Sequence, residues 1–321
     1  MQDLKWNIQD LKIKIDTSFF EISKKVIGQK SLVRDLFIVL FSRGHILIEW
    51  APWLAKTLAV DSLSKVLNLN FKRIQFTPDL LPSDLIWSNI YNPAKNEFYV
   101  KNWPIFSNFV LADEINRAPS KVQSALLEAM AERQVSIWDT TFKLDLPFIV
   151  LATQNPIEQE WTFNLPEAQL DRFLLKTIVD YPNESEELEI MRQNKNIEKI
   201  QINSIFSKEE ILQVQDLVDE IYVDENILNY IKDIVFYTRN SNTNISKYIS
   251  YPVSPRASLS LLKTAKALAL ISWRDFVIPE DVKEMTYWVL RHRIILNYDA
   301  MADEIKVDDL IKIILDNVEV K

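Results

Sequence analysis

One stretch of the chain, HILIEWAPWLAKTLAVDSLSKVLN, restricts the fold more than any other. A short apolar strand in HILIE is followed by a loop, and then by a segment whose apolar residues recur at helical spacing. Strand, loop and helix in this order form the phosphate-binding unit of nucleotide-binding α/β proteins. The loop ends in Lys56 and Thr57, the residue types that contact the terminal phosphates and Mg²⁺. The sequence therefore predicts a nucleotide site at this loop.

The same loop is unusual because bulky residues stand where glycine is expected. Trp50 and Trp53 occupy its first and fourth positions, where unusual φ angles and the close phosphate favour glycine. Taken alone the motif is weak, since an ordinary strand-to-helix loop with a chance Lys-Thr pair is equally consistent with it. The candidate nucleotide-binding residues of the loop are Trp50, Ala51, Pro52, Trp53, Leu54, Ala55, Lys56 and Thr57.

Two later apolar strands end in polar residues suited to nucleotide hydrolysis. FVLADEI ends in Asp113 and Glu114, so that one carboxylate can hold Mg²⁺ together with Thr57 and the next can polarise the attacking water. VLATQN ends in Asn155, an amide that can position that water. As an alternative to a catalytic role, Asp113 and Glu114 could be a solvent-exposed acidic end of the strand. Asn155 could likewise belong to an ordinary turn.

Strands alternate with helices up to residue 182, which favours an α/β fold: a parallel sheet with helices on both faces. QVSI and FKLDL flank WDTT and predict a hairpin, whereas the Pro-rich FTPDLLPSDL is typical of a loop. From residue 183 onward, charged helical segments such as SKEEILQVQDLVDEI replace the strand pattern. We expect a nucleotide-binding core at residues 1–182 and a smaller all-helical lid domain at 183–321.

Composition restricts the function classes. The net charge of -8 argues weakly against nucleic acid or membrane surfaces as partners, and the absence of cysteine excludes disulfides and thiolate metal sites. The most apolar stretch is interrupted by charged residues, so no segment reaches the roughly 18 apolar residues of a membrane span. The first residues lack the apolar core of a signal peptide, so the cytoplasm is the expected location. His45 and His292 are expected to be structural, and Arg291 and Arg293 to lie on the lid surface.

Several long blocks resemble the MoxR-type AAA+ ATPases. LADEINRAPSKVQSALLEAMAERQVSI, ATQNPIEQE, LPEAQLDRF, SPRA and VLRHRI occur in the order of that family over most of the chain. The resemblance implies a P-loop core with a helical lid, and ATP with Mg²⁺ as cofactors. It also implies ATP hydrolysis in a homo-hexameric ring that acts as a chaperone or remodeler. A partner protein with a von Willebrand factor A domain would accompany the ring.

The resemblance also assigns roles to individual residues. Asp113 and Glu114 would be the Walker B pair and Asn155 sensor 1. Arg172 of LDRF would be an arginine finger acting on a neighbouring subunit's nucleotide, and Arg256 of SPRA would be sensor 2 in the lid.

Ile27 and Gly28 of VIGQ would lie near the adenine. The alternative for Arg172 is a surface ion pair with Asp171 or Glu167, and for Arg256 a surface position at a helix start.

Glycine is abnormally scarce and tryptophan abnormally frequent. The chain has two glycines and nine tryptophans, whereas an average glycine share of about 7% would give roughly 22. Tryptophan stands where MoxR-like sequences carry glycine at positions 50, 53, 87, 103, 161 and 273, and Trp138 lies in a predicted two-residue turn that favours glycine. We hypothesise that the gene reads UGA as glycine and that the sequence was translated with a table that reads UGA as tryptophan.

The alternative is a divergent protein that is truly rich in tryptophan. Trp6 and Trp288 have no family glycine opposite them and stay undetermined. For function, a non-hydrolysing scaffold and a DNA-remodelling motor remain open beside an active ATPase. Joint retention of the phosphate-loop, Walker B, sensor and finger residues argues against the scaffold, and the acidic charge balance argues against the DNA motor.

Overall fold

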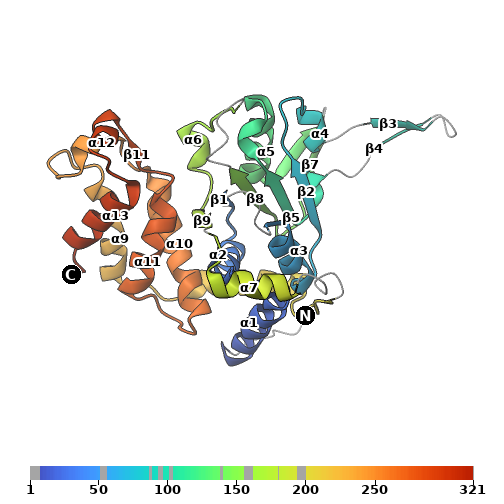
Figure 1. Cartoon of the computed structure of the whole chain (residues 1–321), viewed down its shortest axis with the longest axis horizontal. Helices are drawn as coiled ribbons and strands as arrows, with labels where there is room; N and C mark the ends of the chain where they lie inside the picture. The colour runs from blue at the N-terminus through green and yellow to red at the C-terminus, as the bar shows by residue number, and fades with distance from the viewer. Residues whose placement is uncertain are drawn as a thin grey trace.

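A parallel β-sheet with helices on both faces forms the centre of the molecule, and a bundle of helices lies beside it (Figure 1). The computed structural model describes residues 8–50, 56–86, 89–92, 97–100, 104–137, 140–154, 162–179, 181–193 and 200–320. This architecture confirms the α/β fold class with a helical lid.

The central sheet has five strands in the order β2-β5-β8-β1-β9, and every neighbouring pair is parallel. The strands are β1 (Ile46–Trp50), β2 (Phe71–Gln75), β5 (Phe109–Asp113), β8 (Ile149–Gln154) and β9 (Leu175–Val179). The inner strands are buried on both faces, which explains their nearly continuous apolar sequences. Because all strands are parallel, their carboxyl ends share one edge of the sheet and their amino ends the other.

Alternate residues of the strands face two separate apolar clusters. Ile46 and Ile48 of β1 pack into the larger cluster, whereas Leu47 between them packs into the smaller one. The larger cluster includes residues of α1 (Ile8–Ser23), α2 (Lys30–Phe41) and α3 (Lys56–Val66). The smaller one includes residues of α4 (Pro82–Ile86) and α5 (Ser120–Glu132), so these helices cover the opposite face.

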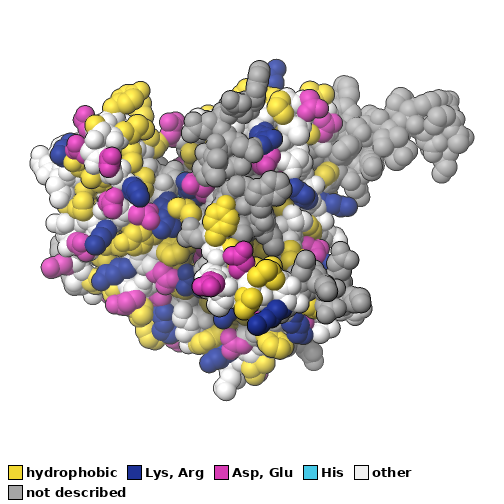
Figure 2. Space-filling view, in the orientation of Figure 1, with side chains coloured by type: hydrophobic (Ala, Val, Ile, Leu, Met, Phe, Trp, Pro, Cys, Tyr) yellow, Lys and Arg dark blue, Asp and Glu magenta, His cyan; other side chains and the backbone are white. Residues whose placement is uncertain are grey.

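The second half of the chain, which we call the lid from residue 200 onward, is mainly helical. Its helices are α8 (Lys208–Glu220), α9 (Glu225–Tyr237), α10 (Pro255–Ile271), α11 (Pro279–Leu290), α12 (Tyr298–Ala302) and α13 (Val307–Asn317). Side chains of Ser207, Asp224 and Ser254 cap α8, α9 and α10 by accepting from backbone N–H groups of the first turn. Acidic and basic side chains are interspersed over the visible face of the lid (Figure 2).

The prediction of an entirely helical second domain is wrong in one detail. Antiparallel strands β10 (Ile249–Tyr251) and β11 (Ile295–Leu296) pair beside a short 3₁₀ helix, η4 (Ser246–Tyr248). These strands are too short to leave a periodic pattern in the sequence. The proposed boundary at residue 182 falls between β9 and α7 (Glu184–Gln193), but the larger apolar cluster continues from α2 into α8 and α10. One hydrophobic cluster therefore extends across residue 182. The division into two domains at that residue stays a prediction.

Two hairpins lie outside the central sheet. The predicted one is confirmed as β6 (Gln134–Ile137) and β7 (Thr140–Lys143), and β3 (Asn89–Asn92) with β4 (Glu97–Val100) projects far from the body (Figure 1). The segment predicted as a Pro-rich loop contains α4, where Pro82 occupies the first helical position that suits proline. Within the described ranges, no helix is both long and apolar enough to cross a membrane.

Candidate functional site

The carboxyl edge of the sheet carries an acidic pair at the end of β5, which β8 separates from β1. Asp113 is the last residue of β5, and it is almost fully buried. Its Oδ1 accepts a hydrogen bond of 2.6 Å from the hydroxyl of Thr153 on the adjacent strand β8. The same Thr153 oxygen accepts from the backbone N–H of Glu114 at 2.9 Å. One threonine thus fixes both members of the acidic pair.

Glu114 has a backbone conformation that only a tightly packed site sustains. Its φ of 58° lies in the left-handed region, which costs an ordinary residue about 1–2 kcal/mol. This bend turns the chain from β5 into the short helix η2 (Ile115–Arg117). The carboxylate accepts from Gln75 Nε2 at 2.9 Å and pairs with Arg117 at 3.0 Å, both at Oε2. Glu114 is therefore held at the sheet edge and only half-buried.

The second oxygen of Asp113 faces a cation on β2. Arg73 donates to Oδ2 through Nε at 3.1 Å and also through Nη2, while its Nη2 donates to Gln75 Oε1 at 2.9 Å. One carboxylate oxygen of Asp113 thus accepts a hydrogen bond from Thr153, and the other accepts from Arg73. Carboxylate and hydroxyl oxygens are the hard ligands that Mg²⁺ prefers, and Mg²⁺ commonly binds one or two of them together with water and phosphates. Asp113 and Thr57 fit this requirement.

The phosphate loop joins this edge, although residues 51–55 and Asn155 lie outside the described residues. Trp50 ends β1, α3 begins at Lys56, and Thr57 is half-buried in the first turn of α3. Register places Glu49 of β1 beside Gln154 of β8, the residue before Asn155. The start of a helix favours anions through its free N–H groups and dipole. The carboxyl ends of β1 and β8, which directly precede the predicted loop and Asn155 in the sequence, therefore share an edge with the acidic pair.

Ile27 and Gly28 lie in the turn between α1 and α2. Gly28 has a φ of 74°, which favours glycine, and a Cβ built on it would lie 2.8 Å from Glu186 Oε2 of α7, so that the Glu186 side chain would have to shift. Contact of these two residues with an adenine is still a prediction.

The opposite, amino edge of the sheet carries a basic cavity between core and lid. The cavity measures about 380 Å³ and opens where α2 leads into β1. Its lining residues come from the ends of α2 and α5, the start of β9, and α10 and α11 of the lid. They are Ser42, Arg43, Gly44, His45, Met130, Ala131, Arg133, Asp171, Arg172, Leu174, Arg256, Leu259, Ser260, Lys263 and Arg293. Both predicted catalytic arginines, Arg172 and Arg256, line it.

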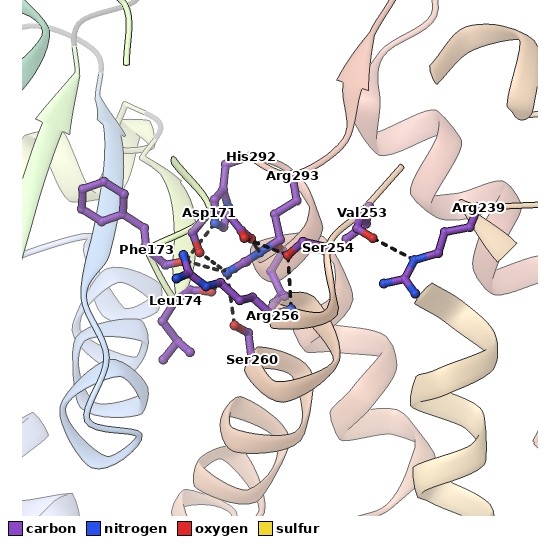
Figure 3. A network of polar contacts seen from close by, with 11 residues as sticks. Asp171, Phe173, Leu174, Arg239, Val253, Ser254, Arg256, Ser260, His292 and Arg293 are labelled. Carbon is purple, nitrogen blue, oxygen red and sulfur yellow. Dashed lines mark hydrogen bonds and ion pairs between the residues drawn. The ribbon is translucent and has the colours of Figure 1, made fainter. Parts of the chain in front are cut away.

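A polar network ties the lid to the core beside this cavity (Figure 3). Asp171 accepts from Arg293 Nε at 2.8 Å on one oxygen and from Ser254 Oγ at 2.7 Å on the other. Arg293 also donates to the carbonyls of Phe173 and Leu174 at the start of β9. Its side chain is 2% exposed, so the prediction that Arg293 lies on the lid surface is wrong. The guanidinium is instead desolvated, and it depends on Asp171 and backbone carbonyls for its partners.

The two histidines have structural hydrogen bonds at the same edge. His45 accepts from Val150 N at 3.0 Å through Nδ1 and contacts Met130 O through Nε2, so it is neutral. His292 contacts Phe173 O at 3.0 Å. Burial lowers the pKa of both rings, that of His45 to about 4.

Comparison with known proteins gives the family. The family described as ATPase family associated with various cellular activities (AAA) matches residues 45–175, and the AAA lid domain matches residues 241–314. Chaperone MoxR1 of Mycobacterium tuberculosis is 44% identical over 95% of this chain and 81% of its own length. The chain belongs to the MoxR family of AAA+ ATPases.

Two further proteins are similar to this chain over nearly its whole length. YeaC of Bacillus subtilis is 40% identical, over 97% of this chain and 96% of its own. A crystal structure of a proposed ATPase from Cytophaga hutchinsonii superimposes with a TM-score of 0.92 at 47% identity, covering 98% of this chain and 97% of the other. The overall fold is thus shared with a solved structure.

The arginines predicted for the MoxR finger and sensor lie at the amino edge of the sheet, opposite the edge that carries the acidic pair. Strand β1 separates the two edges and, with five residues, spans about 15 Å. Arg172 donates to Leu127 O of α5 at 2.8 Å, while Asp171 pairs with Arg293 instead. Among the described residues, neither Arg172 nor Arg256 forms an ion pair with a carboxylate.

Sequence reasoning missed the residues that hold the site together. Thr153 lies in the apolar strand β8, and Arg73 and Gln75 lie in β2, whose sequence FKRIQ does not indicate which residues these side chains contact. The signal for Thr153 was a hydroxyl in the otherwise apolar IVLATQ, directly before the predicted sensor. Asp171 and Arg293 were visible in the MoxR blocks LDRF and VLRHRI, but only the fold shows that they meet.

Proposed function

We propose that this chain binds ATP with Mg²⁺ and hydrolyses it to ADP and phosphate at sites formed between neighbouring copies in a ring. The observation that carries the proposal is the separation of two complementary edges. The carboxyl edge carries the phosphate loop and the acidic pair, and the amino edge carries arginines without carboxylate partners among the described residues. A head-to-tail contact would bring the basic edge of one copy onto the phosphates held by the next.

In the proposed reaction, Glu114 accepts a proton from a water molecule that attacks the γ-phosphorus as the bond to the bridging oxygen breaks and ADP leaves. Lys56 neutralises the terminal phosphate oxygens, and Arg172 of the neighbour meets the charge that spreads over them in the transition state. Asn155 orients the water. Thr57 and Asp113 would hold Mg²⁺, which would supply positive charge to stabilise the phosphate oxygens.

The proposed biological role is remodelling of partner proteins. The name of MoxR1 describes a chaperone, and this chain covers most of that relative's length. We propose a homo-hexameric ring that works with a partner carrying a von Willebrand factor A domain. Arg293 and Ser254 connect the lid to Asp171, so movement of the lid would be transmitted to the adjacent Arg172.

We further propose that the natural protein carries glycine at positions 50, 53, 87, 103, 138, 161 and 273. Trp273 supports this, because it follows α10 with a left-handed φ of 65°. Its N–H bonds to Leu270 O at 3.0 Å, and that of Arg274 to Ala269 O at 2.9 Å, the helix ending that strongly favours glycine. The pairing of Ile137 with Thr140 leaves two residues in the hairpin loop, for which glycine is favoured at the first.

Trp288 contrasts with Trp273. Its indole Nε1 donates to the buried carboxylate of Asp35 at 2.8 Å, a bond that glycine cannot form. We therefore expect Trp288 to be genuine. Gene sequencing tests the proposal: UGA at codons 50, 53 and 273 with UGG at codon 288 is expected, and UGG at codons 50 and 53 would end it.

Steady-state hydrolysis tests the ATPase assignment. We compare the chain as written with a glycine-restored chain, which carries glycine at the seven positions above. The restored chain is expected to bind and hydrolyse ATP, whereas Trp50 and Trp53 should crowd the β-phosphate and weaken binding. Glu114→Gln in the restored chain should bind ATP but lose about 100-fold or more in kcat. Full activity in that variant would contradict the role of Glu114.

A further inference from the structure

Arg133 is a cation in the basic cavity to which no role has been assigned. It lines the cavity together with Arg172 and Arg256, from the C-terminal end of α5. Its backbone N–H donates to Ala129 O at 3.0 Å, and its φ of 51° lies in the left-handed region. This strained turn ends the helix where the side chain joins the cavity wall. The backbone therefore fixes the point from which the guanidinium extends.

The charge of Arg133 is poorly compensated, unlike that of two other arginines in the cavity. Arg43 pairs with Asp216 and Asp219 of α8, and Arg293 pairs with Asp171. The Arg133 guanidinium donates a 3.3 Å hydrogen bond from Nη2 to the backbone oxygen of Arg43. Over the described part of the chain, no carboxylate pairs with it.

The surroundings of Arg133 disfavour a lone positive charge. The side chain is half-buried, and burial together with the nearby Arg43 charge lowers its pKa. An arginine nevertheless stays protonated at neutral pH. A half-buried cation close to other cations is unfavourable in a single copy. An anion bound in the cavity would reduce the repulsion between these charges.

We propose that Arg133 contacts the phosphates of the nucleotide bound by a second copy of this chain, as a third arginine beside Arg172 and Arg256. This inference rests on the proposed function. Three features select a polyphosphate. Among the described residues, Arg133, Arg172 and Arg256 of the cavity have no carboxylate partner. The cavity has a volume of about 380 Å³. Guanidinium groups bind phosphate oxygens in a bidentate manner. Arg172 is anchored to Leu127 O of α5, the helix that Arg133 ends, so the two arginines have a common support.

The expected effect is on turnover rather than on folding. In the glycine-restored chain, Arg133→Gln should lower kcat about 10- to 100-fold, because one donor to developing phosphate charge is lost. Arg133→Lys should retain part of the activity. Arg291→Gln is the control from outside the cavity, and because Arg291 pairs with Asp308 it should keep kcat within about twofold of the parent. Circular dichroism and mass photometry should show an unchanged fold and ring.

Subunit mixing decides whether Arg133 acts on a neighbour. Arg133→Gln and Glu114→Gln subunits, each with the reduced kcat predicted above, are mixed in equal amounts and allowed to exchange. With random placement, about a quarter of the interfaces combine an intact Glu114 with an intact Arg133 from the adjacent copy, so substantial activity should return. No recovery in rings shown to contain both variants would overturn the proposal. Loss of ring assembly in Arg133→Gln would also overturn it, in favour of an ion pair between subunits.

The same data separate this inference from the proposed function. If the glycine-restored parent hydrolyses no ATP, or if Glu114→Gln is fully active, the proposed function fails and the inference fails with it. If the parent is active, Glu114→Gln is inactive, and Arg133→Gln keeps the parent kcat, only the role of Arg133 is contradicted.

Discussion

The two edges of one sheet differ in charge, in support and in the part of a reaction they can supply. At the carboxyl edge, Asp113 and Glu114 are fixed by Thr153, Arg73 and Gln75, all of which belong to the sheet itself. At the amino edge, arginines from core and lid surround a cavity, and Asp171 joins the two parts. The acidic pair is therefore supported by the core alone, whereas the basic cavity combines Arg43, Arg133 and Arg172 of the core with Arg256 and Arg293 of the lid. Neither edge holds a full hydrolytic site by itself.

The largest expected effect comes from removing the finger arginine. Arg172→Ala in the glycine-restored chain should lower kcat about 1,000-fold, because an arginine finger contributes that much or more to phosphoryl transfer. Within the described part of the chain, the Arg172 side chain donates one hydrogen bond, to Leu127 O, so ATP binding and folding should change little. Steady-state kinetics and fluorescent nucleotide binding measure the two quantities. Weakened folding with unchanged kcat would make Arg172 a structural residue.

The second largest expected effect comes from breaking the connection between lid and core, and it concerns the free energy of unfolding. Arg293→Met leaves Asp171 without its cation in a desolvated place, which typically costs about 3–5 kcal/mol of unfolding free energy. The control is Arg291→Met, since the neighbouring Arg291 pairs with the more exposed Asp308 and should lose about 1 kcal/mol or less. Urea unfolding measures both. Equal losses of unfolding free energy in the two variants would contradict the expectation that the buried Asp171–Arg293 pair contributes more to stability than the more exposed pair.

Acid should destabilise the basic edge through His45. Burial lowers the pKa of His45 from 6.5 to about 4, so the unfolded chain binds a proton between these values that the folded chain does not. Folding free energy is therefore lost as pH falls from 6.5 to 4, by about 3 kcal/mol from this one group. Protonation would remove the acceptor of Val150 N–H and add charge near Arg133.

Urea unfolding at several pH values tests this effect against His45→Gln, which lacks the titrating ring. Asp35 acts in the opposite direction, since burial raises its pKa to about 6 and the folded chain takes up its proton first. Because both proteins keep Asp35, its contribution cancels in the comparison. Identical acid slopes in the parent and in His45→Gln would contradict the expectation.

The smallest expected effect concerns the support of the acidic edge. Thr153→Val removes the hydroxyl that binds both Asp113 Oδ1 and Glu114 N, and should lower kcat about 10- to 100-fold with a raised Mg²⁺ requirement. Thr177→Val is the matched control, because Thr177 is an equally buried threonine of β9 whose hydroxyl binds Asp35 instead. Its kcat and Mg²⁺ dependence should stay near the parent values. Similar kinetics for both variants would remove Thr153 from the site.

The local sequence pattern predicted the residues of the acidic edge better than those of the basic edge. Asp113 and Glu114 directly follow a buried strand, so one short stretch of sequence contains both the support and the functional groups. Arg172 and Arg293 are distant in sequence and meet through Asp171 only when the lid docks. A charged residue in VLRHRI has no local sign of burial, which is why Arg293 was expected on the surface. Family resemblance supplied Arg172 and Arg256 but not their common cavity.

The most direct measurement of the central claim mixes subunits that lack opposite edges. Glu114→Gln and Arg172→Ala variants of the glycine-restored chain are combined in equal amounts, and ATP hydrolysis is compared with that of each variant alone. If the hydrolytic site is assembled from the acidic edge of one copy and the basic edge of the next, about a quarter of the interfaces should be intact and activity should return. Hydrolysis that stays at the level of the separate variants, in rings containing both, would contradict the account.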